Sequence, residues 1–183
     1  MSYVEQMLAF NKEFVEKKEY EKFTTTKYPD KKVAVLSCMD TRLTELLPAA
    51  LDFKNGDVKI IKNAGGVISH PFGSVMRSLL VAVYELGVSE IFVIGHYDCG
   101  MQGLHPQDMT SKMLRRGIKQ EDIEFIRYCG VDVDQWLKGF DDPEESVRET
   151  VRIVSTHPLI PKDVAVSGFL IDPETGRMDV ISR

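Results

Sequence analysis

The sequence has few cysteines, no long apolar run and no excess of basic residues. Three cysteines in 183 residues are too few, and odd in number, for a disulfide framework. We therefore expect free thiols and a cytoplasmic, reducing location. Residues 1–23 mix acids and bases and lack the charged-then-apolar order of a signal peptide. No apolar run approaches the roughly 18 residues that a membrane-spanning helix needs, so we expect no membrane partner.

The charge balance limits the kinds of partner further. The formal net charge is −5 and the isoelectric point is about 5.4. A general nucleic-acid binder needs a basic face that replaces counterions, so we expect no nucleic-acid partner. The basic cluster of Lys112, Arg115 and Arg116 is followed by acids, and we interpret it as a solvated helix face. The length and the ordinary composition predict one globular domain.

Short apolar runs alternate with helical segments through the middle of the chain. The segment between the second and third runs has Ser74 as a predicted N-cap and Gly87 as a predicted C-cap. Strand, helix and strand in about thirty residues form a βαβ unit, which implies a parallel sheet. The fold class is therefore α/β: a single domain with a mostly parallel sheet of four or five strands, flanked by helices. We predict buried strands at residues 32–38, 58–64, 91–95 and 164–171, and an edge strand at 177–181.

Helical spacing predicts an N-terminal helix over residues 3–23, ahead of the first strand. Such an arm either covers its own domain or packs on a partner subunit, and the sequence does not choose between these uses. We accordingly divide the chain into an N-terminal helical arm, residues 1–30, and an α/β domain, residues 31–183, which contains the candidate functional residues. A helix over residues 43–53 contains Pro48, which a helix tolerates only near its first turn, so we expect this helix to start late.

A long helical stretch runs from residue 107 to 156. Its last helix is predicted to begin at Asp142 as N-cap, with Glu145 completing a capping box. Cys129 lies among apolar residues of this stretch, and we interpret it as a packing residue.

Two short motifs directly follow two of the predicted buried strands. Cys38, Asp40 and Arg42 leave the first strand, and His96 and Cys99 leave the third. In an open parallel sheet, sites form beyond the carboxyl ends of the strands, where the strand order reverses. If the order is 2-1-3-4, that point lies between the first and third strands. The two motifs should then meet.

The residue types in these motifs predict a catalytic zinc site. A set of two Cys and one His leaves one position of a tetrahedral zinc ion unfilled, which is typical of catalytic sites. The alternative is that Cys38 and Cys99 are small buried hydrophobes and His96 is a core histidine. The spacing of Asp40 and Arg42 lets a guanidinium clamp a carboxylate that faces the metal. The alternative for that pair is a surface ion pair of little value.

With these motifs the chain resembles the β-class carbonic anhydrases, in their short prokaryotic branch. The resemblance implies one Zn²⁺ per chain with Cys38, His96 and Cys99 as ligands. It makes Asp40 and Arg42 the catalytic pair beside the fourth position, which Asp40 can also occupy as a metal ligand. It also implies a homodimer or a dimer-based tetramer, with the helical arm against a neighbour. The matching segments are the first motif, IIKNAGG (60–66), GHYDCGM (95–101) and VAVSGFLIDPETG (164–176).

The activity implied by the resemblance is the reversible hydration of carbon dioxide to bicarbonate and a proton by zinc-bound hydroxide. Two thiolates neutralise the dication, so the bound water should be less acidic than the pKa of about 7 seen with three histidines. We therefore expect the activity to rise on the alkaline side of neutrality. Two alternatives are a carbonyl sulfide or carbon disulfide hydrolase and a catalytically silent zinc-binding protein. Tyr97 stands where small residues such as Thr are common, so it either alters the pocket or points away.

Overall fold

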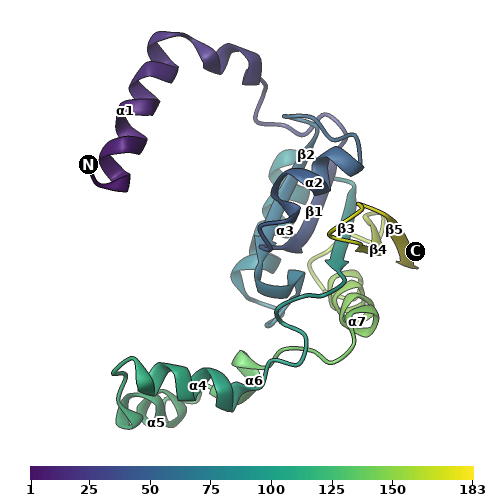
Figure 1. The fold of residues 1–183 in the computed structure, drawn as a ribbon. Coiled ribbons are helices and arrows are strands. Elements are labelled where there is room, and N and C mark those ends of the chain that lie inside the picture. The colour runs from purple at the N-terminus through teal and green to yellow at the C-terminus, as the bar shows by residue number, and fades with distance from the viewer.

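The computed structural model describes all residues from Met1 to Arg183 and contains one five-stranded sheet (Figure 1). The strand order is β2-β1-β3-β4-β5, and the first four strands are parallel while β5 runs antiparallel to β4. The α/β fold class, the reversal of strand order between β1 and β3 and the edge strand are therefore confirmed. The strands are β1 (Val33–Cys38), β2 (Val58–Asn63), β3 (Glu90–His96), β4 (Ala165–Ile171) and β5 (Met178–Ser182).

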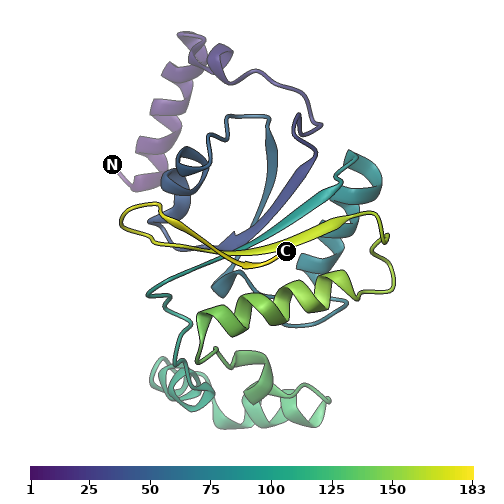
Figure 2. The same cartoon turned by 90° about the vertical axis from the view of Figure 1, so that its right-hand side faces the viewer.

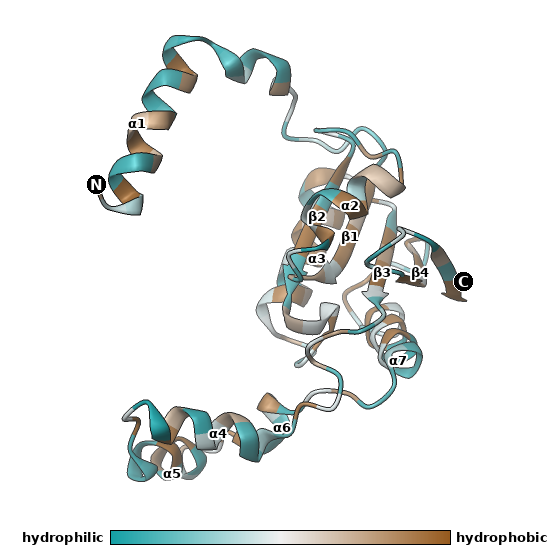
Figure 3. Ribbon diagram, in the orientation of Figure 1, coloured by the Kyte–Doolittle hydropathy of each residue, from teal (hydrophilic) through white to brown (hydrophobic).

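Helices cover both faces of this sheet, and the core lies between them. On one face lie α3 (Ser74–Leu86) and α7 (Pro143–Ser155), whose apolar residues pack on β1, β3 and β4. The opposite face carries α2 (Leu43–Ala50). Figure 2 shows α7 running along one face of the sheet, and Figure 3 shows apolar colour along β1 and β3 and also on α1, α2 and α3. Every residue of β1 is buried, as expected for a central parallel strand.

The N-terminal helix stands apart from the sheet (Figure 1). This helix, α1 (Tyr3–Glu16), has a complete capping box at Ser2 and no buried residue. A short 3₁₀ helix, η1 (Glu19–Phe23), follows it. The prediction of one helix over residues 3–23 is thus wrong in its last part. The reason is Lys18, whose positive φ of 55° is left-handed and cannot continue an α-helix.

The helical stretch after Cys99 is divided into four helices. The first three lie together below the sheet in Figure 1 and share a small core of Ile123, Val133 and Leu137. Cys129 follows the second of them as its C-cap and is exposed, so the packing role predicted for it is wrong. A side chain at this helix end faces solvent rather than the shared core. The three helices are α4 (Pro106–Arg115), α5 (Gln120–Tyr128) and α6 (Val133–Leu137).

Two predicted helix starts differ from the structure. Helix α2 begins at Leu43, not late, and holds Pro48 inside it. The helix is only eight residues long, so Pro48 lies near its end and the missing N–H removes a single helical hydrogen bond. Helix α3 has Gly73 rather than Ser74 as its N-cap. The predicted C-cap Gly87 is confirmed, with a left-handed φ of 70°.

The start of α7 was predicted correctly. The side chain of Asp142 accepts hydrogen bonds from the backbone N–H groups of Glu144 and Glu145, at 2.7 and 3.1 Å. Only this half of the predicted capping box is formed, since the side chain of Glu145 makes no bond back to Asp142.

Candidate metal centre

Adjacent ends of two parallel strands position the candidate ligands. Cys38 is the last residue of β1 and His96 is the last residue of β3, and these strands pair directly. Cys99 follows on the turn after β3. Gly66, in the loop after β2, packs against this end of β1: a Cβ there would lie 3.0 Å from the backbone N of Cys38, and its φ is +67°. Only glycine fits such a close approach with a left-handed backbone.

The structure brings Cys38, His96 and Cys99 together in a buried cluster. Their ligand atoms all lie within 4.8 Å of one another. The two Sγ atoms are 3.9 Å apart. Tetrahedral zinc with bonds of about 2.3 Å to sulfur would place two sulfurs about 3.8 Å apart. The cluster could therefore hold a tetrahedral metal ion with little movement.

The ring of His96 is oriented for metal binding. Its Nδ1 lies 2.8 Å from the carbonyl oxygen of Tyr97. A carbonyl only accepts hydrogen bonds, so Nδ1 carries the proton and Nε2 presents its lone pair. This Nε2 is buried and has no hydrogen-bond partner. An orphaned buried acceptor is costly, and a metal ion between the two sulfurs and this nitrogen would satisfy it.

The thiols also perturb each other's protonation. The contact with Cys99 lowers the pKa of Cys38, with further help from His96 and from the backbone N–H groups of Asp40 and Gly65. The same contact raises the pKa of Cys99, because two adjacent thiolates repel. Burial lowers the pKa of His96, but the contacts with Cys38 and the Tyr97 carbonyl raise it overall. A dication would let both cysteines ionise together and keep the imidazole neutral.

Asp40 and Arg42 form a two-pronged ion pair beside this cluster. Arg42 donates from Nε to Asp40 Oδ1 at 3.0 Å and from Nη2 to Oδ2 at 2.9 Å. The backbone N–H of Arg42 also donates to Oδ1, at 2.9 Å. These bonds from Arg42 lower the pKa of Asp40 to about 2, so the carboxylate is ionised at neutral pH. Its Oδ2 lies 3.8 Å from Nε2 of His96, which places a carboxylate oxygen beside the position that a metal ion would take.

The sequence motifs did not single out Asp98, although it lies between two candidate ligands. Its carboxylate accepts a hydrogen bond from Arg42 Nη1 at 3.0 Å, and its carbonyl oxygen accepts one from Nη2 at 2.9 Å. Its position inside the second motif was the only available signal.

Tyr97 points away from the cluster. Its hydroxyl donates to Asp179 Oδ2 on β5 at 2.9 Å, and its ring packs on the apolar cluster between the sheet and α7. Of the two interpretations of this bulky residue, the second is therefore correct.

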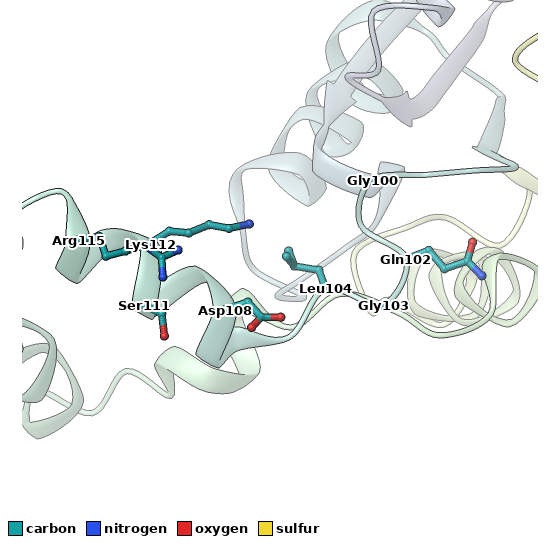
Figure 4. A pocket seen from close by; sticks show the side chains of 8 residues that line it. All are labelled: Gly100, Gln102, Gly103, Leu104, Asp108, Ser111, Lys112 and Arg115. Atoms are coloured by element: carbon teal, nitrogen blue, oxygen red, sulfur yellow. The ribbon is translucent and has the colours of Figure 1, made fainter.

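Two cavities open near the cluster. The first has a volume of about 490 Å³ and is lined by Cys38, Cys99, Asp40 and Arg42, with Met39, Ala64 and Met101 as its main apolar wall. The second, of about 400 Å³, lies between the Gly100–Leu104 loop and α4 and is lined mostly by polar residues. Figure 4 shows Lys112 and Arg115 of the predicted solvated face beside this second cavity. None of the predicted site residues lines it.

Comparison with known proteins agrees with this geometry. The family model described as carbonic anhydrase matches residues 33–178. The solved β-carbonic anhydrase isoform I of Trichomonas vaginalis superposes with a TM-score of 0.91 and is 38% identical, over 100% of this chain and 99% of the other. The chain belongs to the β-carbonic anhydrase family.

Two curated relatives carry different activity names. A Bacillus subtilis protein named "Putative carbonic anhydrase YtiB" is 57% identical, over 99% of this chain and 97% of that protein. A protein named carbon disulfide hydrolase, from an Acidianus strain, is 30% identical over 81% of this chain and 76% of its own length. The β-carbonic anhydrase family thus has relatives under both activity names.

No helix of the structure is both long and apolar enough to cross a bilayer.

Proposed function

We propose that this β-carbonic anhydrase family member is an enzyme that catalyses the zinc-dependent reversible hydration of carbon dioxide to bicarbonate and a proton. The observation that carries the proposal is the convergence of two buried sulfurs and an orphaned imidazole nitrogen within 4.8 Å. An ionised carboxylate lies on the open side of that cluster. Family membership adds independent support.

In this proposal Cys38, His96 and Cys99 hold one Zn²⁺ per chain. A zinc ion held by these three residues would supply a hydroxide nucleophile near neutral pH, because zinc lowers the pKa of water. The bond from His96 Nδ1 to the Tyr97 carbonyl fixes the imidazole plane and its tautomer. Gly66 lets the loop after β2 pack closely against the end of β1, and this packing fixes the backbone position of Cys38.

Asp40 orients the attacking water in the proposed reaction. Its carboxylate is ionised and can only accept a hydrogen bond. The fork of Arg42 fixes both of its oxygens, so the water's remaining lone pair is aimed at the substrate carbon. Met39 and Met101 line the same cavity and suit an uncharged, apolar substrate. If the bonds to Arg42 were broken, Asp40 would be a further residue able to hold the metal, since its Oδ2 lies 3.8 Å from Nε2 of His96.

Metal analysis of the purified protein and a stopped-flow hydration assay test this proposal together. We expect about one zinc ion per chain and hydration activity that rises above neutral pH. Removal of zinc with a chelator should abolish the activity, and added zinc should restore it. A zinc-loaded protein without hydration activity between roughly pH 6 and 9 would contradict the proposal and favour a catalytically silent zinc-binding protein.

A second candidate is the hydrolysis of carbon disulfide or carbonyl sulfide, supported by the relatedness to the Acidianus hydrolase. The same residues would serve that reaction, since the nucleophile and the attacked carbon are of the same kind. Parallel assays on carbon dioxide, carbonyl sulfide and carbon disulfide separate the two functions. We expect carbon dioxide to be turned over with the largest kcat/KM.

We further propose that residues 1–30 form an arm that packs on a second copy of the chain, while residues 31–183 form the catalytic domain. The support is that α1 carries Met7, Leu8 and Phe10 yet buries none of its residues. We expect a homodimer or a dimer-based tetramer by light scattering, and a monomer after deletion of residues 1–30.

The small molecule carbon dioxide or bicarbonate is the proposed ligand, and a cytoplasmic location stays a prediction.

A further inference from the structure

The Arg42 side chain connects the two loops that carry the candidate ligands. One edge of its guanidinium group binds the carboxylate of Asp40, in the loop after Cys38. Two further hydrogen bonds reach Asp98, the residue before Cys99: Nη1 donates to its carboxylate and Nη2 to its carbonyl oxygen. Bonds from a planar guanidinium to two acceptors on each side fix its orientation more fully than one ion pair does.

The backbone of Asp98 has an unusual conformation that makes this contact possible. Its φ is +52°, in the left-handed region that most side chains avoid. Aspartate is among the few residues that visit this region. The turn lets the carbonyl and the carboxylate of one residue meet the same guanidinium. The Asp98 side chain is 86% exposed. An ion pair that is this exposed contributes little to the stability of the fold, so its main effect is to orient Arg42.

We infer that Asp98 is a positioning residue, which fixes the guanidinium of Arg42 from the Cys99 side and thereby holds Asp40 aimed at the metal position. The catalytic meaning of this role rests on the proposed function, whereas its effect on the metal cluster does not. The contact ties the loop after Cys38 to the loop before Cys99. If the bonds between Asp40 and Arg42 were broken, the two bonds to Asp98 would still hold the guanidinium.

Three variants distinguish the contribution of the Asp98 carboxylate from that of the Asp98 backbone carbonyl. Asp98→Gly removes the carboxylate, keeps the carbonyl and accepts the positive φ without strain. Asp98→Asn keeps an acceptor oxygen in the same place but removes the charge. Asp52→Gly is the matched control, because Asp52 is also an exposed aspartate with a positive φ, of 50°, and it lies outside the candidate site.

Two measurements on these variants need no catalytic assay. One is the zinc dissociation constant by chelator competition, and the other is the solvent exchange rate of the Arg42 Nε–H in zinc-free protein by NMR. For Asp98→Gly we expect zinc binding about threefold weaker and exchange about threefold faster, the size of effect expected of one exposed ion pair. Asp98→Asn should lie between Asp98→Gly and the unchanged protein. Asp52→Gly should match the unchanged protein.

The hydration assay then tests whether the positioning matters for turnover. We expect kcat/KM of Asp98→Gly to fall about threefold, with partial recovery in Asp98→Asn. If Asp98→Gly equals Asp52→Gly in zinc affinity and in Arg42 exchange, the positioning role is wrong. An unchanged protein that binds zinc but hydrates no carbon dioxide overturns the proposed function instead, while the affinity and exchange data still judge the role of Asp98.

Discussion

The candidate site has a buried half and an exposed half, and the two are held in place by different means. Cys38, His96 and Cys99 are at most 6% exposed and lie at or just beyond the ends of paired strands. The side chains of Arg42 and Asp98 are 37% and 86% exposed and lie on loops. The backbone of the sheet fixes the buried half, whereas hydrogen bonds between side chains fix the exposed half. Substitutions in the two halves should therefore fail in different ways.

The largest expected effect comes from removing a ligand of the buried half. In Cys99→Ser, we expect the zinc content to fall from about one ion per chain to almost none, because a neutral hydroxyl is a far weaker zinc ligand than a thiolate. Metal analysis after dialysis checks this. Cys129→Ser is the control, since Cys129 is a free but exposed cysteine, and it should keep its zinc. Retention of zinc by Cys99→Ser would exclude this cysteine as a ligand.

Removing the charge of Asp40, the carboxylate that Arg42 of the exposed half holds, should spare the metal and slow the reaction. For Asp40→Asn, we expect zinc content to stay the same and kcat/KM to fall about a hundredfold, in the range of groups that handle a proton in the transition state. The amide keeps the size of the side chain but accepts more weakly and cannot replace water as an anionic ligand. Stopped-flow assays across pH check this, and full activity at every pH would disprove the role of Asp40.

The ion pair of the exposed half should also contribute to stability in a pH-dependent way. Arg42 lowers the pKa of Asp40 from 3.8 to about 2, so its contribution is present above about pH 4 and disappears as the pH falls toward 2. In zinc-free Arg42→Gln we expect a lower free energy of unfolding than in the unchanged protein at pH 6, by an amount that solvent screening keeps small. The deficit should shrink on acidification.

Urea unfolding at several pH values measures this deficit, and NMR titration of Asp40 provides a direct check. Arg127→Gln, which breaks the ion pair between Arg127 and Asp134 on the helical segment, should leave the titration of Asp40 unchanged. If Asp40 titrates at the same pH with and without Arg42, the ion pair does not control its ionisation.

The smallest effect is expected at Tyr97, which adjoins His96 but faces away from the cluster. Tyr97→Phe removes the hydrogen bond to Asp179 and should lower the free energy of unfolding by about 1 kcal/mol. Zinc content and kcat/KM should stay unchanged. Thermal unfolding together with the hydration assay tests this, and a change in kcat/KM would show that Tyr97 reaches the site after all.

The two halves also differ in how much of their geometry the sequence pattern predicts. Cys38 and His96 end buried strands with strong apolar patterns, and the expected strand order brings such ends together without knowledge of any side-chain contact. Asp40 and Arg42 are only two positions apart, so their spacing in the sequence is enough to predict the ion pair. The contact between Arg42 and Asp98 joins residues 56 positions apart and depends on a positive φ, which no pattern in this sequence indicates.

The wrong predictions for the helical segments also concern features that depend on backbone angles or on tertiary packing. The predicted helix extends past Glu16 to residue 23, but the left-handed backbone at Lys18 ends the α-helix before that point. Pro48 suggested a late start for α2, but the packing of Leu43 and Leu47 against the sheet outweighs one lost hydrogen bond. The apolar neighbours of Cys129 predict a packing role, whereas its place at a helix end exposes it. In each case tertiary contacts or a single backbone angle outweighed the local helical or packing preference of the sequence.

The amino-acid sequence by itself determined the α/β class, the parallel direction of the main strands and the residues that follow their carboxyl ends, because these follow from the hydrophobic period and from the βαβ pattern. Only the tertiary structure decided the spacing of the two sulfurs, the free lone pair of His96 and the double attachment of Arg42. These depend on distances of a few tenths of an ångström and on backbone angles, which are set when the strands and loops pack against one another.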